Sequence, residues 1–344
     1  MFVGVGMLSA VAVGCGLAGW WALMSVVIAS LLAAVAACFV HRAQSTVELI
    51  STDSIVNSAW MLPIKRLFIA ADILVNVVVV SLSAQIFGRY VVPGHDELAA
   101  MALIGLLTIA VSAGLRFSSA IRLGIMGLLI AGALIFVTVG LAVSPANTVH
   151  PTSEAGLGGI MGSIAVFFPF FLLGYLAMSR SESSGKAVRI LRILVGTVLA
   201  VGVVAVSLYQ RDAVGLGLSA TPLRDVLAAA DASVLEPWLV VVVVVATFTA
   251  AIFAFRQAIT RLKVLSTKEN AKSSRVQPVL FLGILAAAFV FLTSHFLAPH
   301  MGSLALLWLA AGLAILESLA GAALVLATAL ASQDENQGEQ NPGD

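Results

Sequence analysis

The sequence predicts an all-α membrane protein with about ten transmembrane helices. Of its 344 residues, 60% are hydrophobic and 10% are charged, whereas soluble domains carry about 25% charged residues. The hydrophobic residues form long blocks along the whole chain, and a helix that crosses a bilayer needs about 20 such residues. The block at 239–255 does not alternate apolar and polar residues, as the strands of a membrane barrel do. We therefore expect a polytopic helical protein that is embedded in a lipid bilayer.

Ten apolar segments can be recognised, and the first two are separated by a turn. A single helix over residues 1–40 would be about 60 Å long, twice the roughly 30 Å thickness of the hydrocarbon core. Gly14, Cys15, Gly16 and the Trp20–Trp21 pair mark a turn near a membrane interface, where tryptophan is favoured. The segments lie at residues 1–16, 17–40, 67–89, 98–115, 121–143, 159–179, 188–208, 237–256, 278–297 and 303–330.

The basic residues predict the orientation of these segments. The loops at 41–66, 116–122, 180–192 and 256–277 hold 15 of the 18 Lys and Arg residues, and cytoplasmic loops are rich in these residues. Both termini are therefore expected in the cytoplasm, with the membrane domain (1–330) in the cytoplasmic (inner) membrane. The acidic tail at 331–344 is expected to be disordered.

The long loop at 209–236 is predicted on the opposite side of the membrane. Its stretch TPLRDVLAAADASVLEP, which begins at Thr221, could form an amphipathic interfacial helix with a threonine cap and a proline in its first turn. A solvated connector without regular structure is the alternative.

A few polar residues lie inside the apolar segments, where they are the first candidates for binding a substrate or a coupling ion. Asp72 and Asn76 are four residues apart and hence on one face of the third segment, although Asp72 could instead reach the headgroup region. Thr247 and Thr249 could bond to the carbonyls of their own helix. Glu317 lies in the middle of the last segment, where Ser318 or neighbouring helices could satisfy it.

The chain carries no sequence pattern of an enzyme. HExxH, GxSxG and CxxC motifs are absent, and neither Cys15 nor Cys38 suggests a metal site. The GLGG at 156–159 follows no strand and so is no nucleotide-binding loop. We therefore expect a protein that is not an enzyme and that has no metal, no organic cofactor and no nucleic-acid partner.

The stretch FFPFFLLGY, residues 167–175, predicts either a kinked or a broken sixth helix. Pro169 removes the backbone hydrogen bond to the carbonyl of Ala165, and Gly174 weakens the helix again. Transporters with five-plus-five inverted repeats break their first and sixth helices to expose backbone groups to a substrate. The repeats would lie at about 1–143 and 159–330, and the first segment carries Gly4 and Gly6. A pair of broken helices is therefore the preferred interpretation.

Three stretches resemble the amino acid–polyamine–organocation (APC) permease superfamily. They are MFVGVG (1–6), SAGLRFSSAIRLGIMGLLIAGALIFVTVG (112–140) and GGIMGSIAVFFPFFLLGY (158–175). Weaker similarity lies in FGRYVVP (87–93), TRLKVLS (260–266) and VQPV (276–279). The resemblance implies a short, divergent ten-helix member that transports an amino acid or related small amine by alternating access, coupled to H⁺ or Na⁺. It also implies that the substrate lies between the broken helices, next to Phe2, Val3, Gly4, Phe168, Pro169, Phe170, Leu173, Gly174 and Tyr175, with Phe170 or Tyr175 as a gate.

The chain departs from the family pattern at several positions. The glycines that precede the first-helix phenylalanine are missing before Phe2, and Leu176 replaces the acid that often follows the sixth-helix motif. Two interpretations stay open. Either the glycine loop is encoded upstream of Met1, or the protein is a non-transporting sensor or subunit on a permease scaffold.

Overall fold

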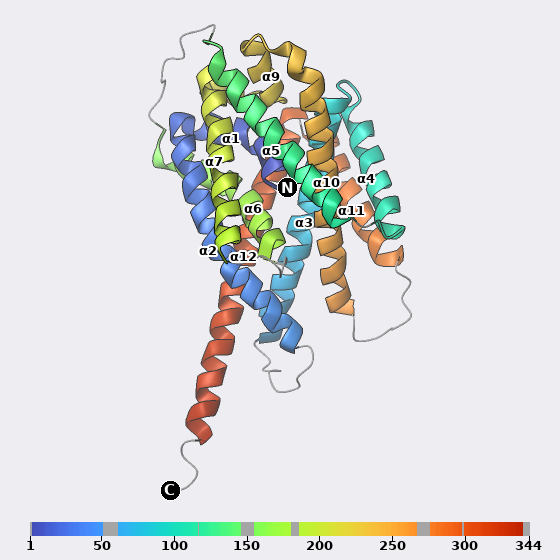
Figure 1. The fold of residues 1–344 in the computed structure, drawn as a ribbon. Coiled ribbons are helices and arrows are strands. Elements are labelled where there is room, and N and C mark those ends of the chain that lie inside the picture. The colour runs from blue at the N-terminus through green and yellow to red at the C-terminus, as the bar shows by residue number, and fades with distance from the viewer. Residues whose placement is uncertain are drawn as a thin grey trace.

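Each predicted apolar segment overlaps a long helix in the described residues (Figure 1). The computed structural model describes residues 2–50, 61–115, 117–145, 155–179, 186–266, 276–297 and 299–339, and every regular element within them is helical. The long helices are α1 (Phe2–Ala18), α2 (Ala22–Ile50), α3 (Met61–Val91), α4 (Asp96–Ser112), α5 (Ser119–Ala142), α6 (Leu157–Ser179), α7 (Lys186–Gln210), α10 (Glu236–Ser266), α11 (Val276–Phe296) and α12 (Pro299–Glu339).

Eight helical stretches in the described residues are long and apolar enough to cross a membrane. The helices α1 and α2 count as one of them, over Leu8–Val47, because only the short 3₁₀ turn η1 (Gly19–Trp21) separates the two helices. Helix α4 is shorter, with 17 residues. The prediction of a multi-pass helical membrane protein is confirmed.

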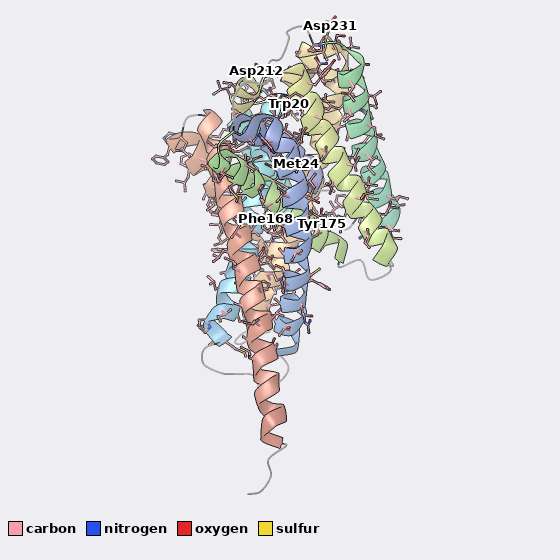
Figure 2. The ribbon with its side chains drawn as sticks, turned by 90° about the vertical axis from the view of Figure 1, so that its left-hand side faces the viewer. Trp20, Met24, Phe168, Tyr175, Asp212 and Asp231 are labelled. Carbon is pink, nitrogen blue, oxygen red and sulfur yellow. The ribbon has the colours of Figure 1, made fainter. Side chains whose placement is uncertain are left out.

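The predicted turn between the first two segments is present at Trp20 and Trp21, but α1 continues through Gly14, Cys15 and Gly16 to Ala18, so the turn begins later than predicted. Gly19 has a φ of +53°, a backbone conformation that favours glycine. Trp20 and Trp21, which follow it, are exposed, as expected for tryptophan at a membrane interface. In Figure 2, Trp20 lies at the same end of the bundle as Asp212 and Asp231. We call this end, which also carries the short helix α9, the α9 end.

The two helices on either side of the turn pack on α6 and run in opposite directions. From Gly6 to Gly14 of α1, the contacting residue of α6 moves back from Phe170 to Phe167, so these two helices are antiparallel. From Ser25 to Ser30 of α2, the contacting residue of α6 moves forward from Ile160 to Tyr175, so α2 runs parallel to α6.

Helix α3 occupies the centre of the bundle. It is the most thoroughly buried of the candidate spans, whereas α5 is the least buried. The main neighbours of α3 are α10 and α12, followed by α4. A helix whose middle is mostly apolar all round is expected in such a position, and the polar side chains of Asp72, Asn76 and Gln85 on α3 are buried among other helices.

The loop at 209–236 forms the short helices α8 (Ala213–Gly217) and α9 (Pro222–Ala229). The predicted amphipathic helix is confirmed, with Pro222 in its first turn, but the side chain of Thr221 makes no capping hydrogen bond. Tyr90 at the end of α3 holds α9 in place, since its hydroxyl accepts from the Leu223 N–H at 3.3 Å and its carbonyl accepts from Arg224 Nη2 at 3.0 Å.

Both helices that were expected to be broken are continuous. Helix α6 runs from Leu157 to Ser179 with Pro169 inside it, and α1 is uninterrupted from Phe2 to Ala18. A proline in a membrane helix is tolerated where neighbouring groups accommodate it, and Pro169 is enclosed on all sides. The glycines of α1 also serve another purpose than unwinding, because Gly6 and Gly14 allow the phenylalanine rings of α6 to approach closely.

Several helices are longer than the apolar segments from which they were predicted. Helix α2 ends at Ile50, α10 at Ser266 and α12 at Glu339. The tail expected to be disordered is thus helical up to Glu339, and residues 340–344 lie outside the described residues. Glutamine, glutamate, lysine and arginine are good helix formers, so the helices continue past the apolar segments. Arg261, expected in a loop, consequently lies within α10.

Candidate functional site

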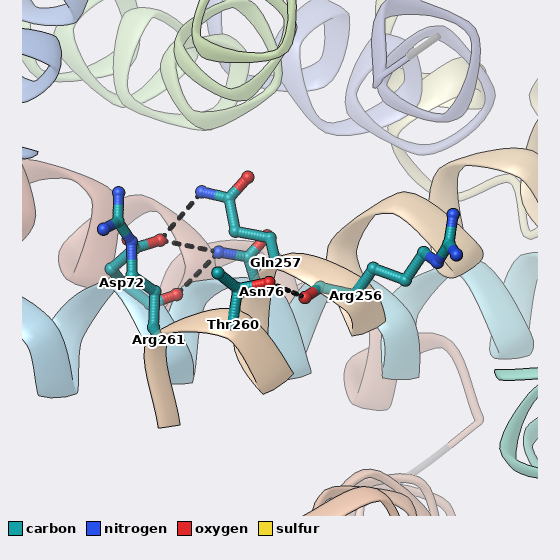
Figure 3. Close-up of polar contacts among 6 residues, drawn as sticks. All are labelled: Asp72, Asn76, Arg256, Gln257, Thr260 and Arg261. Atoms are coloured by element: carbon teal, nitrogen blue, oxygen red, sulfur yellow. Dashed lines mark hydrogen bonds and ion pairs between the residues drawn. The ribbon is translucent and has the colours of Figure 1, made fainter. Parts of the chain in front are cut away.

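A buried ion pair joins the two helices that make the most extensive contact in the bundle, α3 and α10 (Figure 3). Arg261 Nε lies 2.7 Å from Asp72 Oδ2. The side chains of the two residues are only 3% and 0% exposed. The pair is therefore a hydrogen-bonded salt bridge that is shielded from the surroundings.

Two amide side chains complete the surroundings of the Asp72 carboxylate. Its Oδ1 accepts hydrogen bonds from Asn76 Nδ2 and from Gln257 Nε2, both at 2.9 Å. Asn76 Nδ2 also donates to the Asp72 carbonyl at 2.6 Å. Each carboxylate oxygen is thus bonded, and the negative charge is held by one guanidinium and two amides.

Helix periodicity explains why these four residues meet. Asp72 and Asn76 are one turn apart on α3, and Gln257 and Arg261 are one turn apart on α10, so each pair shares one helix face. The two faces lie against each other at the end of the bundle opposite the α9 end. Asn76 Oδ1 is the one acceptor of this cluster that is buried without a partner in the described part of the chain.

A charge pair in this position is unfavourable unless it is fully bonded. Removing two ions from water costs several kcal/mol per ion, and replacing such a pair by apolar residues is often neutral or stabilising. Stability alone therefore gives no reason for the Asp72–Arg261 pair. Ionisable groups inside membrane helices commonly mark the routes of substrates and ions.

The predicted substrate site between α1 and α6 is closed in this structure. Gly6 lies so close to Phe170 that a Cβ atom at this glycine would be 2.6 Å from the ring atom Cγ. A cavity of only about 10 Å³ remains beside this contact, which is at the lower limit for one water molecule. Gly4 faces Ala246 of α10 instead of α6. The side chains of Phe2 and Val3 lie outside the described residues.

The predicted residues of α6 are all buried, and Phe170 is the one among them that lines the small cavity of about 10 Å³. These residues are Phe168, Pro169, Phe170, Leu173, Gly174 and Tyr175. Phe168 and Tyr175 are labelled in Figure 2, where they lie further from the α9 end than Trp20 and Met24.

Tyr175 makes a polar contact that the sequence did not predict. Its hydroxyl is 2.6 Å from Ser30 Oγ on α2, and Ser30 Oγ is 2.6 Å from Thr197 Oγ1 on α7. This chain of hydroxyls connects α2, α6 and α7, so Tyr175 is anchored in a network between helices.

The remaining candidates are two threonines that bond within their own helix and a buried acid on α12, the helix that packs beside α3. Thr247 and Thr249 donate to carbonyls one turn earlier in α10, to Val243 at 2.8 Å in the case of Thr247. Glu317 is completely buried on α12, and Ser318 bonds to the Ala314 carbonyl. No group of three or more His, Cys, Asp and Glu residues in the described ranges could hold a metal ion.

The structure thus brings Asp72 and Asn76 together, as their spacing predicted, and adds Gln257 and Arg261. Sequence reasoning missed these two because it ended the eighth segment at residue 256 and assigned Arg261 to a loop. Their spacing of four residues could have indicated a shared face. Comparisons of the chain with models of known protein families and with curated proteins gave no match.

Proposed function

We propose that the protein is a secondary active transporter that moves an amino acid or a related small amine across the cytoplasmic membrane by alternating access. The buried Asp72–Arg261 pair carries this proposal. It joins two membrane-spanning helices at 2.7 Å and is nearly inaccessible, and a helical bundle does not need it for stability.

The pair supplies a means of coupling to protons. Protonation of Asp72 would remove the charge that compensates Arg261, and the buried guanidinium would then favour a more hydrated position. Movement of α10 relative to α3 would follow from the binding of a proton. Na⁺ would act at the same carboxylate by competing with Arg261.

The contact between α1 and α6 is the proposed route of the solute. These helices are antiparallel and meet through glycine and phenylalanine, which supports their assignment as corresponding helices of two inverted repeats. The pairing of α3 with α10 supports the same repeat. In the open states, we expect α1 to unwind near Gly4 and α6 near Pro169 and Gly174, which would expose backbone groups to the solute.

The basic residues support the proposed orientation. Exposed Arg42 and Lys263 belong to the end of the bundle opposite the α9 end. By the positive-inside rule this end, which includes the C-terminal part of α12, faces the cytoplasm. The α9 end would then face outward.

Uptake by proteoliposomes tests the proposal. Purified protein is reconstituted and offered radiolabelled amino acids and amines one at a time, with and without an imposed H⁺ or Na⁺ gradient. We expect saturable, gradient-dependent uptake of at least one compound, and its loss in Asp72→Asn. Thr249→Ser, which keeps a hydroxyl that bonds within its own helix, is the matched control and should transport normally. Correctly folded protein that takes up none of the compounds would contradict the proposal.

The closed contact between α1 and α6 favours a second candidate, a sensor or subunit on the same scaffold that does not transport. Continuous helices and a cavity of about 10 Å³ leave no space for a solute there. This candidate predicts no uptake by the folded protein and no effect of a gradient.

A further inference from the structure

A second cavity, of about 160 Å³, lies at the α9 end between α3, α4 and α11. It is far larger than the space between α1 and α6, and since a water molecule occupies about 30 Å³ in the liquid, it can hold a small organic solute. The lining residues are Gln85, Arg89, Asp96, Glu97, Ala100, Thr293 and Ser294.

The carboxylates give the cavity an excess of negative charge. Asp96 and Glu97 lie in the first turn of α4, where the helix dipole stabilises anions. Among the described lining residues the one cation is Arg89, which interacts electrostatically with Asp96 and whose Nη1 donates to Ser303 Oγ of α12 at 2.8 Å. The formal charge of the lining is therefore −1, which favours a monovalent cation.

Gln85 supplies a buried acceptor at the same cavity. It is 5% exposed, and its Nε2 donates to Thr293 Oγ1 at 2.7 Å, which fixes the amide. Its Oε1 is buried and has no partner in the described part of the chain. An acceptor that is buried without a partner is unfavourable, so a donor on a ligand would stabilise this site.

The backbone holds these groups in place. A Cβ atom at Gly88 would lie 2.2 Å from the carbonyl oxygen of Asp96, so α3 and the first turn of α4 are in direct backbone contact. Gly94, in the connection between them, has a φ of +94°. This contact holds the first turn of α4, with Asp96 and Glu97, at the cavity that Gln85 of α3 also lines.

We propose that this cavity binds a small primary ammonium compound. An ammonium group has three N–H donors, and Asp96, Glu97 and Gln85 offer three acceptor groups. A divalent metal ion fits less well, because Ca²⁺ takes six to eight oxygen ligands and Mg²⁺ needs octahedral geometry. The site is separate from the proposed route between α1 and α6, and its occupancy does not depend on transport.

Equilibrium binding of radiolabelled ethanolamine to the purified full-length protein tests the proposal. Choline serves as the second ligand, because it differs from ethanolamine only in the three methyl groups that replace the N–H donors. The main variant is Asp96→Asn/Glu97→Gln, which keeps the shape of both side chains, and Gln85→Met removes the third acceptor. Asp231→Asn is the control, since Asp231 is an exposed acid at the same end whose φ of +49° asparagine tolerates. Size-exclusion chromatography and circular dichroism establish that each variant is folded.

We expect saturable binding of ethanolamine, with at least tenfold weaker binding of choline. The double variant should weaken the binding of ethanolamine by about tenfold or more, because a hydrogen bond to a charged group is worth at least that factor. Asp231→Asn should bind like the wild type. Absence of saturable binding to the folded wild-type protein, or equal affinities of the wild type and the folded double variant, would overturn the proposal. Neither result depends on whether the protein transports a solute.

Discussion

The ion pair between α3 and α10 allows a prediction in which stability and function separate. Asp72→Asn and Arg261→Met each remove one charge and leave the other buried. The double variant removes both charges, and an asparagine at position 72 can still accept the hydrogen bonds that Asn76 and Gln257 now donate to Oδ1 at 2.9 Å.

The expected magnitude follows from the burial of the pair. Two unit charges about 4 Å apart attract each other by about 4 kcal/mol at an effective dielectric constant of about 20. Breaking a buried pair by removing one partner typically costs about 3–5 kcal/mol, whereas replacing both partners is often nearly neutral. Because the side chains of Asp72 and Arg261 are only 0% and 3% exposed, we expect each single variant to lose about 3–5 kcal/mol of unfolding free energy. We expect the double variant to lose less than about 2 kcal/mol.

Reversible unfolding in mixed detergent micelles measures these free energies, and proteoliposomes measure uptake for the same four proteins. If the effects of the two single variants on the free energy of unfolding were additive, the double variant would lose at least about 6 kcal/mol. This is well above the loss of less than about 2 kcal/mol that we expect, so the double-mutant cycle distinguishes the two cases. We expect the double variant to regain stability but not uptake. If it is as unstable as the sum of the single variants, the electrostatic reasoning is refuted. If it is stable and transports normally, the pair has no role in coupling.

Three further variants test the packing around α6. Gly6→Val should lower the free energy of unfolding by about 1–3 kcal/mol, because overpacking costs this much and a Cβ atom at position 6 would be 2.6 Å from Phe170. Gly105→Ala is the control, because a Cβ atom at position 105 meets no other atom within 4 Å. Equal effects of the two variants on the free energy of unfolding would argue against the contact. Pro169→Ala should raise the free energy of unfolding by up to about 3 kcal/mol, since it restores a backbone N–H donor in α6, and it should slow uptake. Unchanged uptake would show that α6 does not need to unwind at position 169. Tyr175→Phe should lower the free energy of unfolding by about 0.5–1.5 kcal/mol, the usual contribution of one hydrogen bond, because it removes the contact with the Ser30 hydroxyl on α2. A larger effect on uptake than on thermal stability would indicate that Tyr175 is a gate.

Local sequence patterns predicted the helices well. The long apolar blocks indicated where the long helices of the described residues lie, and a turn near Trp20 was predicted because a single helix would have exceeded the membrane thickness. The helix from Pro222 was predicted from its turn chemistry and amphipathic spacing. These features depend on residues that are close together in the sequence.

Features that depend on distant residues could not be predicted in the same way. The partner of Asp72 is 189 residues further along the chain, and no local pattern identifies it. Whether Pro169 breaks or merely interrupts the bonding of α6 depends on the helices around it, and here α1 and α2 pack against a continuous α6. Gly6, which suggested an unwound helix, and Gly14, which suggested a turn, both make room for aromatic rings of α6.

The central claim is that the closed contact between α1 and α6 opens to let a solute pass. The most direct test places a cysteine at position 170, where the native ring is 2% exposed, in a protein whose Cys15 and Cys38 have been replaced. A membrane-impermeant thiol reagent is then added from either side of proteoliposomes during uptake, with Leu82→Cys on α3 as the buried control. We predict that solute and gradient change the labelling of position 170 from each side, while position 82 stays unreactive. A cysteine at position 170 that remains unreactive from both sides while the same protein takes up solute would contradict the account.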